Sequence, residues 1–85
     1  MSESMGPAMA LENAFVEVLG IPQDSDFDSL AYGSTAGWDS VAHMALIAEI
    51  ETVFDVMLST EEVIGLSSFH QAKETLTKHG IRFEA

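Results

Sequence analysis

The segment from Val41 to Phe54 constrains the fold more than any other part of the chain, because its apolar residues recur at the spacing of an α-helix. This spacing predicts a helix with one buried face. A loop rich in Gly, Ser, Thr and Asp precedes the segment, and Asp39 or Ser40 is suited to cap the helix at its start. The predicted inward face consists of Met44, Ile47, Ile50 and Phe54, widened by Leu46 and Val53.

Another helix is expected before this loop, over residues 7–19. Pro7 suits the first position of a helix, where its missing N–H costs nothing. Gly20 and Pro22 provide the usual stop at the other end. The apolar residues between them have helical spacing: Leu11, Phe15, Val18 and Leu19.

Two capping signals predict further helices in the C-terminal part. Ser59 followed by Glu62 is a capping box, and it opens a helix of only one or two turns because Gly65 comes soon after. Ser68 followed by Gln71 repeats the pattern for a last helix. The inward face of that helix is predicted to be Phe69, Ala72 and Leu76, with Gly80 closing it and Ile81 and Phe83 packing as a tail.

These elements predict a small all-α protein, because no segment alternates as a strand would. We expect a four-helix bundle with three longer helices, a short third helix and a long loop, residues 21–37, between helices one and two. Phe27, Leu30 and Tyr32 are expected to pin that loop onto the core. Residues 1–6 are expected to form a flexible tail and residues 7–85 a single domain.

Charge is distributed unevenly along the chain. The protein has 14 Asp and Glu against 3 Lys and Arg, a formal net charge of -11. The bases are Lys73, Lys78 and Arg82, so residues 1–72 contain no Lys or Arg. Such a surface repels nucleic acid and anionic membranes, and it attracts basic protein partners.

Cysteine and long apolar runs are both absent from the sequence. Disulfides and thiolate metal sites are therefore excluded, and any thiol chemistry needs a cofactor. No run is long enough to span a membrane, and the N-terminus lacks the basic region followed by an apolar one that marks a secretory signal. These features predict a cytoplasmic protein. A start at Met1 favours a free-standing protein, and an excised domain is the alternative.

Ser40 is the residue to which we expect the function to be attached. A serine in this position is usually only a helix cap, but Asp39 beside it already supplies one. Trp38 is large and apolar in a polar loop, so it can anchor the junction to the bundle. The start of a helix also favours a phosphate ester, through free N–H groups and a dipole worth roughly 0.3–1 kcal/mol.

The tripeptide Asp39-Ser40-Val41 resembles the Asp-Ser-Leu signature of acyl carrier proteins and peptidyl carrier domains, in which the serine carries 4′-phosphopantetheine. The likeness continues over residues 47–51, 54–56 and 58–62. The order of helices also matches the four-helix layout of that family, so the resemblance covers most of the chain. An Asp-Ser pair at a loop–helix boundary, in an acidic chain of this length, is a specific signal.

The resemblance implies a carrier protein that is not itself an enzyme and holds no metal. A phosphopantetheinyl transferase would move 4′-phosphopantetheine from coenzyme A onto Ser40 with Mg²⁺. Either the Mg²⁺ or a basic residue of the transferase would offset the charge of Asp39. The terminal thiol of the arm would then hold an acyl or aminoacyl group as a thioester. The implied partners of this monomer are a loading enzyme and the ketosynthase, condensation or other acyl-transfer enzymes that accept the group.

The resemblance also places a partner-docking face around and below Ser40. We assign to it Trp38, Val41, His43, Met44, Ala45, Ala48 and Glu51. Val41 stands where the family usually has Leu, and Ala42 and Ala45 stand where the fatty-acid-synthesis type often has acids. With Trp38, these departures favour a specialised carrier for polyketide, nonribosomal peptide or related acyl transfer. The alternative is that these positions vary without consequence.

His43 lies three residues after Ser40 and can share its helix face. A Ser–His nucleophile would need an orienting third group and an oxyanion site, and the sequence shows neither. We therefore expect His43 to be a surface contact near the attached arm, and His70 and His79 to be surface residues of the last helix.

Asp24-x-Asp26-x-Asp28 resembles the start of an EF-hand calcium loop, but Ser29 and Thr35 stand where that loop requires Gly and Glu. Two alternatives from other classes stay open beside the carrier. One is an unmodified acidic helical adaptor that binds a basic protein partner. The other is a small calcium-responsive helical protein that uses this acidic segment.

Overall fold

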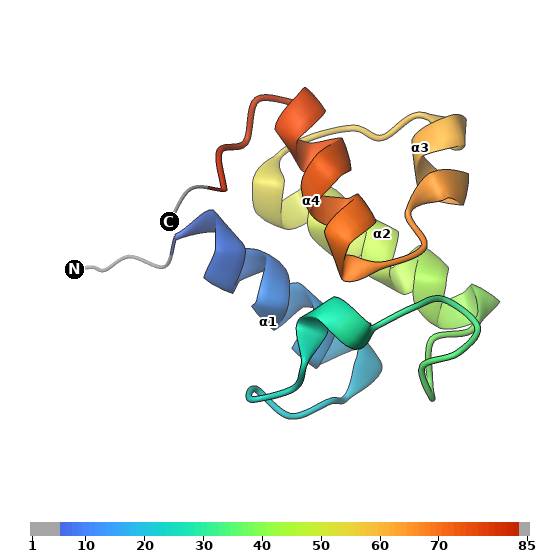
Figure 1. Ribbon diagram of the computed structural model, residues 1–85. Helices are drawn as coiled ribbons and strands as arrows, with labels where there is room; N and C mark the ends of the chain where they lie inside the picture. Colours follow the sequence, from blue (N-terminus) through green and yellow to red (C-terminus); the bar gives the residue numbers. More distant parts are fainter. Residues whose placement is uncertain (1–5, 84–85) are drawn as a thin grey trace.

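Four α-helices and one 3₁₀ turn make up the computed structural model, which describes residues 6–83 (Figure 1). Between those residues no strand forms, and one isolated antiparallel bridge joins Ala31 to Ser68. The predicted all-α class is confirmed, with a short third helix and a long first loop. The elements are α1 (Pro7–Leu19), the 3₁₀ turn η1 (Phe27–Ser29), α2 (Ser40–Phe54), α3 (Thr60–Gly65) and α4 (Phe69–Lys78).

The local signals predicted for α1 are confirmed at both ends. Pro7 is the first helical residue, and Gly20 follows the last with a φ of 69°. This left-handed conformation suits Gly, and it lets the Gly20 N–H donate to the carbonyl of Val16. Of the expected N-terminal tail, residues 1–5 lie outside the described residues, whereas Gly6 is the N-cap residue of α1.

The core lies where α1 and α2 pack side by side, with α4 crossing them and η1 packing against α4 (Figure 1). Aromatic rings connect these elements. Phe15 of α1 meets Trp38 edge-on at 5.4 Å and Phe69 of α4 at 5.2 Å, and Phe69 in turn lies 5.1 Å from Phe27 of η1. The side chains with no exposed surface are Leu11, Phe15, Leu46, Ile50, Leu66, Ala72 and Leu76.

Part of the predicted inward face of α2 is wrong. Met44 is 57% exposed and Val53 is 42% exposed. Met44 lines the open cavity between α2 and α3, and α3 has no buried residue of its own. Phe54 is only half-buried and packs near Phe83, with ring centroids 6.3 Å apart.

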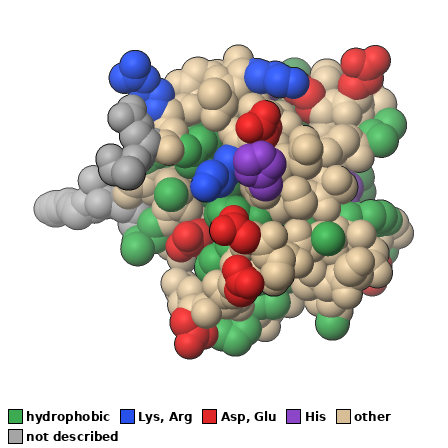
Figure 2. Space-filling model, viewed as in Figure 1, with side chains coloured by type: hydrophobic (Ala, Val, Ile, Leu, Met, Phe, Trp, Pro, Cys, Tyr) green, Lys and Arg blue, Asp and Glu red, His purple; other side chains and the backbone are tan. Residues whose placement is uncertain are grey.

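The loop from α1 to α2 is pinned much as predicted. Phe27 and Leu30 are buried, whereas Tyr32 is 44% exposed. Figure 2 shows Lys and Arg gathered over α4 and the segment after it, with Asp and Glu more widely spread. None of the described helices is long and apolar enough to cross a membrane.

Candidate functional site

Ser40 is the first residue of α2 and is exposed. The cap comes from its neighbour, because Asp39 Oδ1 accepts the N–H of Ala42 at 2.9 Å, as predicted. Within residues 6–83 the hydroxyl of Ser40 makes no hydrogen bond. The N–H groups of Ser40 and Val41 belong to the first turn, where a helix offers no carbonyl partner. A free hydroxyl thus stands beside free backbone donors.

Trp38 is an anchor and not a docking residue. Its side chain is 1% exposed, so it cannot offer its ring to a partner as the sequence-based assignment required. The indole packs edge-on against Phe15 of α1 and lies 6.2 Å from the ring of Tyr32. The predicted anchoring role is confirmed, and it explains the correction: a residue that holds the loop in the core is hidden from the surface.

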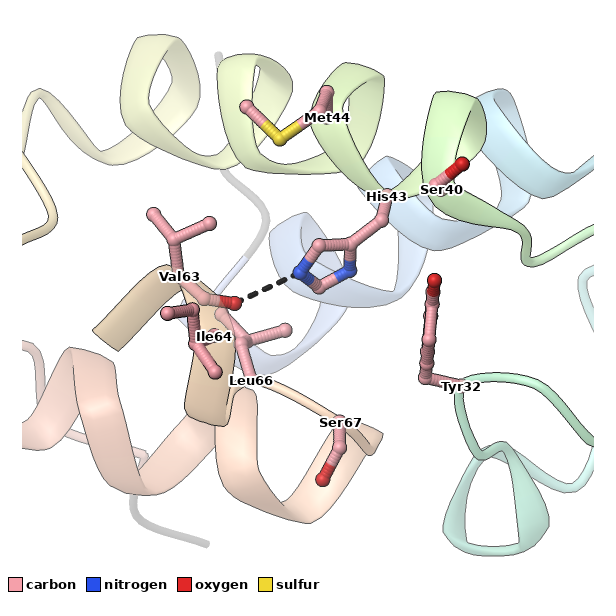
Figure 3. Close-up of a pocket in the computed structure, with 8 residues that line it drawn as sticks. All are labelled: Tyr32, Ser40, His43, Met44, Val63, Ile64, Leu66 and Ser67. Carbon is pink, nitrogen blue, oxygen red and sulfur yellow. Dashed lines mark hydrogen bonds between the residues drawn. The ribbon is translucent and has the colours of Figure 1, made fainter. Parts of the chain in front are cut away.

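A cavity of about 320 Å³ opens beside Ser40, between the start of α2, the loop and α3 (Figure 3). Most of its wall is apolar. Tyr32 projects from the loop, with its hydroxyl toward the Ser40 end of α2. Val63 and Ile64 lie opposite it on α3. The lining residues are Tyr32, Ser40, His43, Met44, Val63, Ile64, Leu66 and Ser67.

A second hollow follows the loop itself, over residues 32–40, with a volume of about 530 Å³. Its lining is more polar than that of the cavity. Gly33 and Gly37 have φ values of 85° and 86°, which only Gly adopts without strain, and these turn the loop around the hollow. Tyr32 and Ser40 line both spaces, so Ser40 stands where a polar groove meets an apolar cavity.

His43 lies inside the site and is not the surface contact expected from the sequence. It is half-buried and accepts a hydrogen bond at Nδ1 from Trp38 Nε1 at 3.0 Å. Its Nε2 lies 2.8 Å from the carbonyl oxygen of Val63, twenty residues later. No third group orients it toward Ser40, because both ring nitrogens are engaged elsewhere.

The remaining docking residues divide into an exposed set and one structural residue. Val41 is 79% exposed, and Met44, Ala45 and Ala48 are also exposed along the same side of α2. Glu51 is half-buried, and its carboxylate accepts the N–H of Leu58 at 2.9 Å. Glu51 therefore holds the segment that follows α2 in place.

α3 is held by polar contacts at its N-terminal end. Ser59 and Glu62 form the predicted capping box, with bonds of 3.1 and 2.9 Å. Glu62 also lies 2.9 Å from Nε2 of His79. The Ser59 N–H, and next the contact with His79, lower the pKa of Glu62 below its usual 4.5, because both favour the carboxylate.

The acidic segment of the first loop is exposed at Asp24, Asp26 and Asp28. Among the described residues, no group of three or more His, Asp or Glu is placed to hold a metal ion. Sequence reasoning missed Tyr32, Ser67 and the α3 residues as cavity lining. The hydrogen bond from the Tyr32 N–H to the Ser67 carbonyl, at 2.8 Å, joins the first loop to the segment after α3. The sequence carries no signal for this contact.

No protein-family model, curated protein or solved structure matches this chain. The function must therefore be argued from the site: an exposed serine with a free hydroxyl, a neighbouring cap, first-turn donors and an apolar cavity.

Proposed function

We propose that this protein is an acyl or peptidyl carrier that holds its cargo as a thioester on 4′-phosphopantetheine attached to Ser40. The observation that carries the proposal is the state of the Ser40 hydroxyl. It is exposed and makes no hydrogen bond within the described residues, because Asp39 supplies the cap. The resemblance of Asp39-Ser40-Val41 to the carrier signature gives this free hydroxyl a chemical role.

Attachment would be a phosphoryl transfer catalysed by a separate transferase. Ser40 Oγ attacks the phosphorus next to pantetheine in coenzyme A, and the bond to the second phosphate breaks, which releases adenosine 3′,5′-bisphosphate. The serine proton passes to a base of the transferase, and Mg²⁺ balances the charge. The new phosphodiester would lie against the first-turn N–H groups of α2, where an anion is favoured.

The two spaces beside Ser40 suit the two chemical parts of a loaded arm. The polar hollow along residues 32–40 is suited to the amide-containing arm, and the apolar cavity of about 320 Å³ to an apolar cargo. The exposed side of α2 with Val41, Met44 and Ala45 would meet the partner enzymes. Its lack of acids at Ala42 and Ala45 favours polyketide, nonribosomal peptide or related acyl transfer.

The experiment is enzymatic loading followed by intact mass measurement. The purified chain is incubated with coenzyme A, Mg²⁺ and a broad-specificity phosphopantetheinyl transferase. We expect the mass to rise by one phosphopantetheinyl group in the unchanged protein and in Ser34→Ala, a control at an exposed serine of the loop that precedes α2. We expect no rise in Ser40→Ala. A rise that survives Ser40→Ala, or none in the unchanged protein, contradicts the proposal.

A second candidate is an unmodified acidic adaptor, favoured by the absence of Lys and Arg from residues 1–72. It predicts a partner complex that forms without modification and dissociates at high salt, since screening weakens contacts between exposed charges. Salt-sensitive binding by Ser40→Ala equal to that of the loaded protein would favour it.

A further inference from the structure

His43 connects three parts of the molecule beside Ser40. Its Nδ1 lies 3.0 Å from Nε1 of Trp38, in the loop before α2. Its Nε2 lies 2.8 Å from the carbonyl oxygen of Val63 in α3 (Figure 3). His43 itself belongs to the first turns of α2. One imidazole therefore connects the loop, α2 and α3 close to Ser40 at the start of α2.

The two partners determine where the imidazole carries its proton. An indole N–H can only donate a hydrogen bond, and a backbone carbonyl can only accept one. Nδ1 must therefore be the acceptor for Trp38, and Nε2 must carry the proton that is donated to Val63. Of the three protonation states of histidine, only the neutral ring with its proton on Nε2 satisfies both contacts.

We propose that protonation of His43 controls whether the loop before Ser40 is hydrogen-bonded to α2 through Trp38. We call this hydrogen bond between His43 and Trp38 the latch. A second proton on the ring binds at Nδ1, which turns that acceptor into a donor facing the Trp38 N–H. The bond to Trp38 is then lost, whereas the Nε2–H bond to Val63 remains and gains charge assistance. The loop that leads into Ser40 would lose its one side-chain hydrogen bond to His43 and keep the Asp39 cap and the packing of the buried Trp38.

The surroundings of Trp38 make the loss of this bond consequential. The Trp38 side chain is 1% exposed, so solvent cannot readily replace His43 as the acceptor of its N–H. The two rings are also stacked, with an interplanar angle of 23° and centroids 6.1 Å apart. A change in the charge of His43 therefore alters the environment of the indole directly.

Few other groups near His43 can change charge. Tyr32 of the loop faces it with a centroid distance of 5.2 Å, and it is the only other titratable residue that lines the cavity. On α2, the carboxylate of Asp39 is held by the Ala42 N–H. On α3, Glu61 and Glu62 line a separate hollow toward α4. Of these groups, the imidazole is the one that gains a donor in place of an acceptor when it takes up a proton.

The latch is independent of what Ser40 carries, and only its effect on the attached arm rests on the proposed function. For an attached arm, the consequence would be a firmly held junction at neutral pH and a loosened one in acid. Because the latch can be measured on the unmodified chain, its failure and a failure of Ser40 loading are separate results.

Trp38 is the only Trp in the chain, so its indole N–H gives a single reporter. We would follow its ¹H–¹⁵N resonance and solvent exchange on the full chain from pH 8 to pH 5. We expect one titration step, with exchange about tenfold faster at the acid end after correction for the intrinsic pH dependence of exchange. A factor of ten corresponds to the loss of a bond worth about 1.4 kcal/mol. His43→Gln should abolish the step, and the matched variants His70→Gln and His79→Gln should retain it.

A second measurement on the unchanged protein keeps the test decisive if His43→Gln does not fold. Long-range ¹H–¹⁵N spectra of the His43 ring at pH 8 should show the proton on Nε2. A proton on Nδ1 would overturn the latch. A pH-independent Trp38 resonance, or a step that persists in a folded His43→Gln variant, would overturn it as well.

Discussion

The two sides of α2 are held in place by different kinds of contact. On one side, α1 packs against it through side chains with no exposed surface, such as Leu11 and Phe15. On the other side, α3 has no buried residue. It is held by the His43 contact to the Val63 carbonyl, by the polar contacts of Glu62 and by the partly buried Val63 side chain, its main apolar contact with the core. The cavity beside Ser40 lies on this second side.

The packed side of α2 therefore positions Ser40, whereas the α3 side forms the cavity beside it. Ser40 begins a helix that packs against α1 and directly follows the loop anchored by the buried Trp38. The wall opposite is a six-residue helix that is held by a few polar contacts and by one partly buried apolar side chain, Val63. Close packing resists gradual change, whereas polar contacts of this kind can be made and broken one at a time.

The largest expected effect tests the packed side. Phe15→Ala should lower the free energy of unfolding by about 3–5 kcal/mol, because it leaves a cavity where three aromatic rings meet. That is a large share of the stability of a small domain. Phe15→Leu, measured by the same denaturant unfolding, should lose less. A loss of under about 1 kcal/mol in Phe15→Ala would mean that this side is not the rigid one.

A smaller loss is expected on the α3 side from Ser59→Ala. This change removes the capping-box oxygen that accepts the Glu62 N–H, a contribution of about 1 kcal/mol. Hydrogen exchange should accelerate in α3 and stay nearly unchanged in α1. Equal acceleration in both helices would show that α3 is part of the same cooperative unit as the core.

The pH dependence of stability provides the third test, through Glu62. The Ser59 N–H and His79 lower the pKa of Glu62 in the folded protein, so its carboxylate stabilises the fold above the usual value of 4.5. This stabilisation is lost as the pH falls through the lowered folded pKa. Glu62→Gln should therefore melt at a lower temperature than the unchanged protein at pH 7, and the gap should close in acid. A gap that stays constant with pH contradicts this account.

The smallest effect is expected from Ile64→Ala, also on α3. Ile64 is 75% exposed, so its removal should change the free energy of unfolding by less than about 0.5 kcal/mol. Because Ile64 lines the cavity, the same variant should weaken the binding of an apolar probe dye there. A stability loss comparable to that of Phe15→Ala would remove the contrast between the two sides.

Local signals made α1 and the helix starts predictable from the sequence. Pro7, the Asp39 cap and the Ser59–Glu62 capping box each act over four residues or fewer, so they do not depend on the rest of the fold. The inward positions of α4 were also predictable, because its apolar residues follow regular helical spacing and Phe69 and Leu76 are buried.

Contacts between distant segments were not predictable in the same way. Met44 satisfies the helical spacing of α2, but it stays exposed because it lines the open cavity between α2 and α3. The pairing of His43 with Val63 spans twenty residues and involves a backbone carbonyl, which leaves no mark in the sequence. Trp38 was identified as an anchor and also assigned to docking, although a residue cannot serve both roles when only 1% of it is exposed.

We propose that Ser40 is the residue that receives the arm. Its most direct test is fragmentation mass spectrometry of the enzymatically loaded chain, with peptides covering all serines. We predict the phosphopantetheinyl group on Ser40 alone, and a Ser40→Ala variant that folds with nearly unchanged stability but stays unloaded. Localisation of the group to another serine, or a chain that remains unmodified while a control carrier is loaded, would contradict the account.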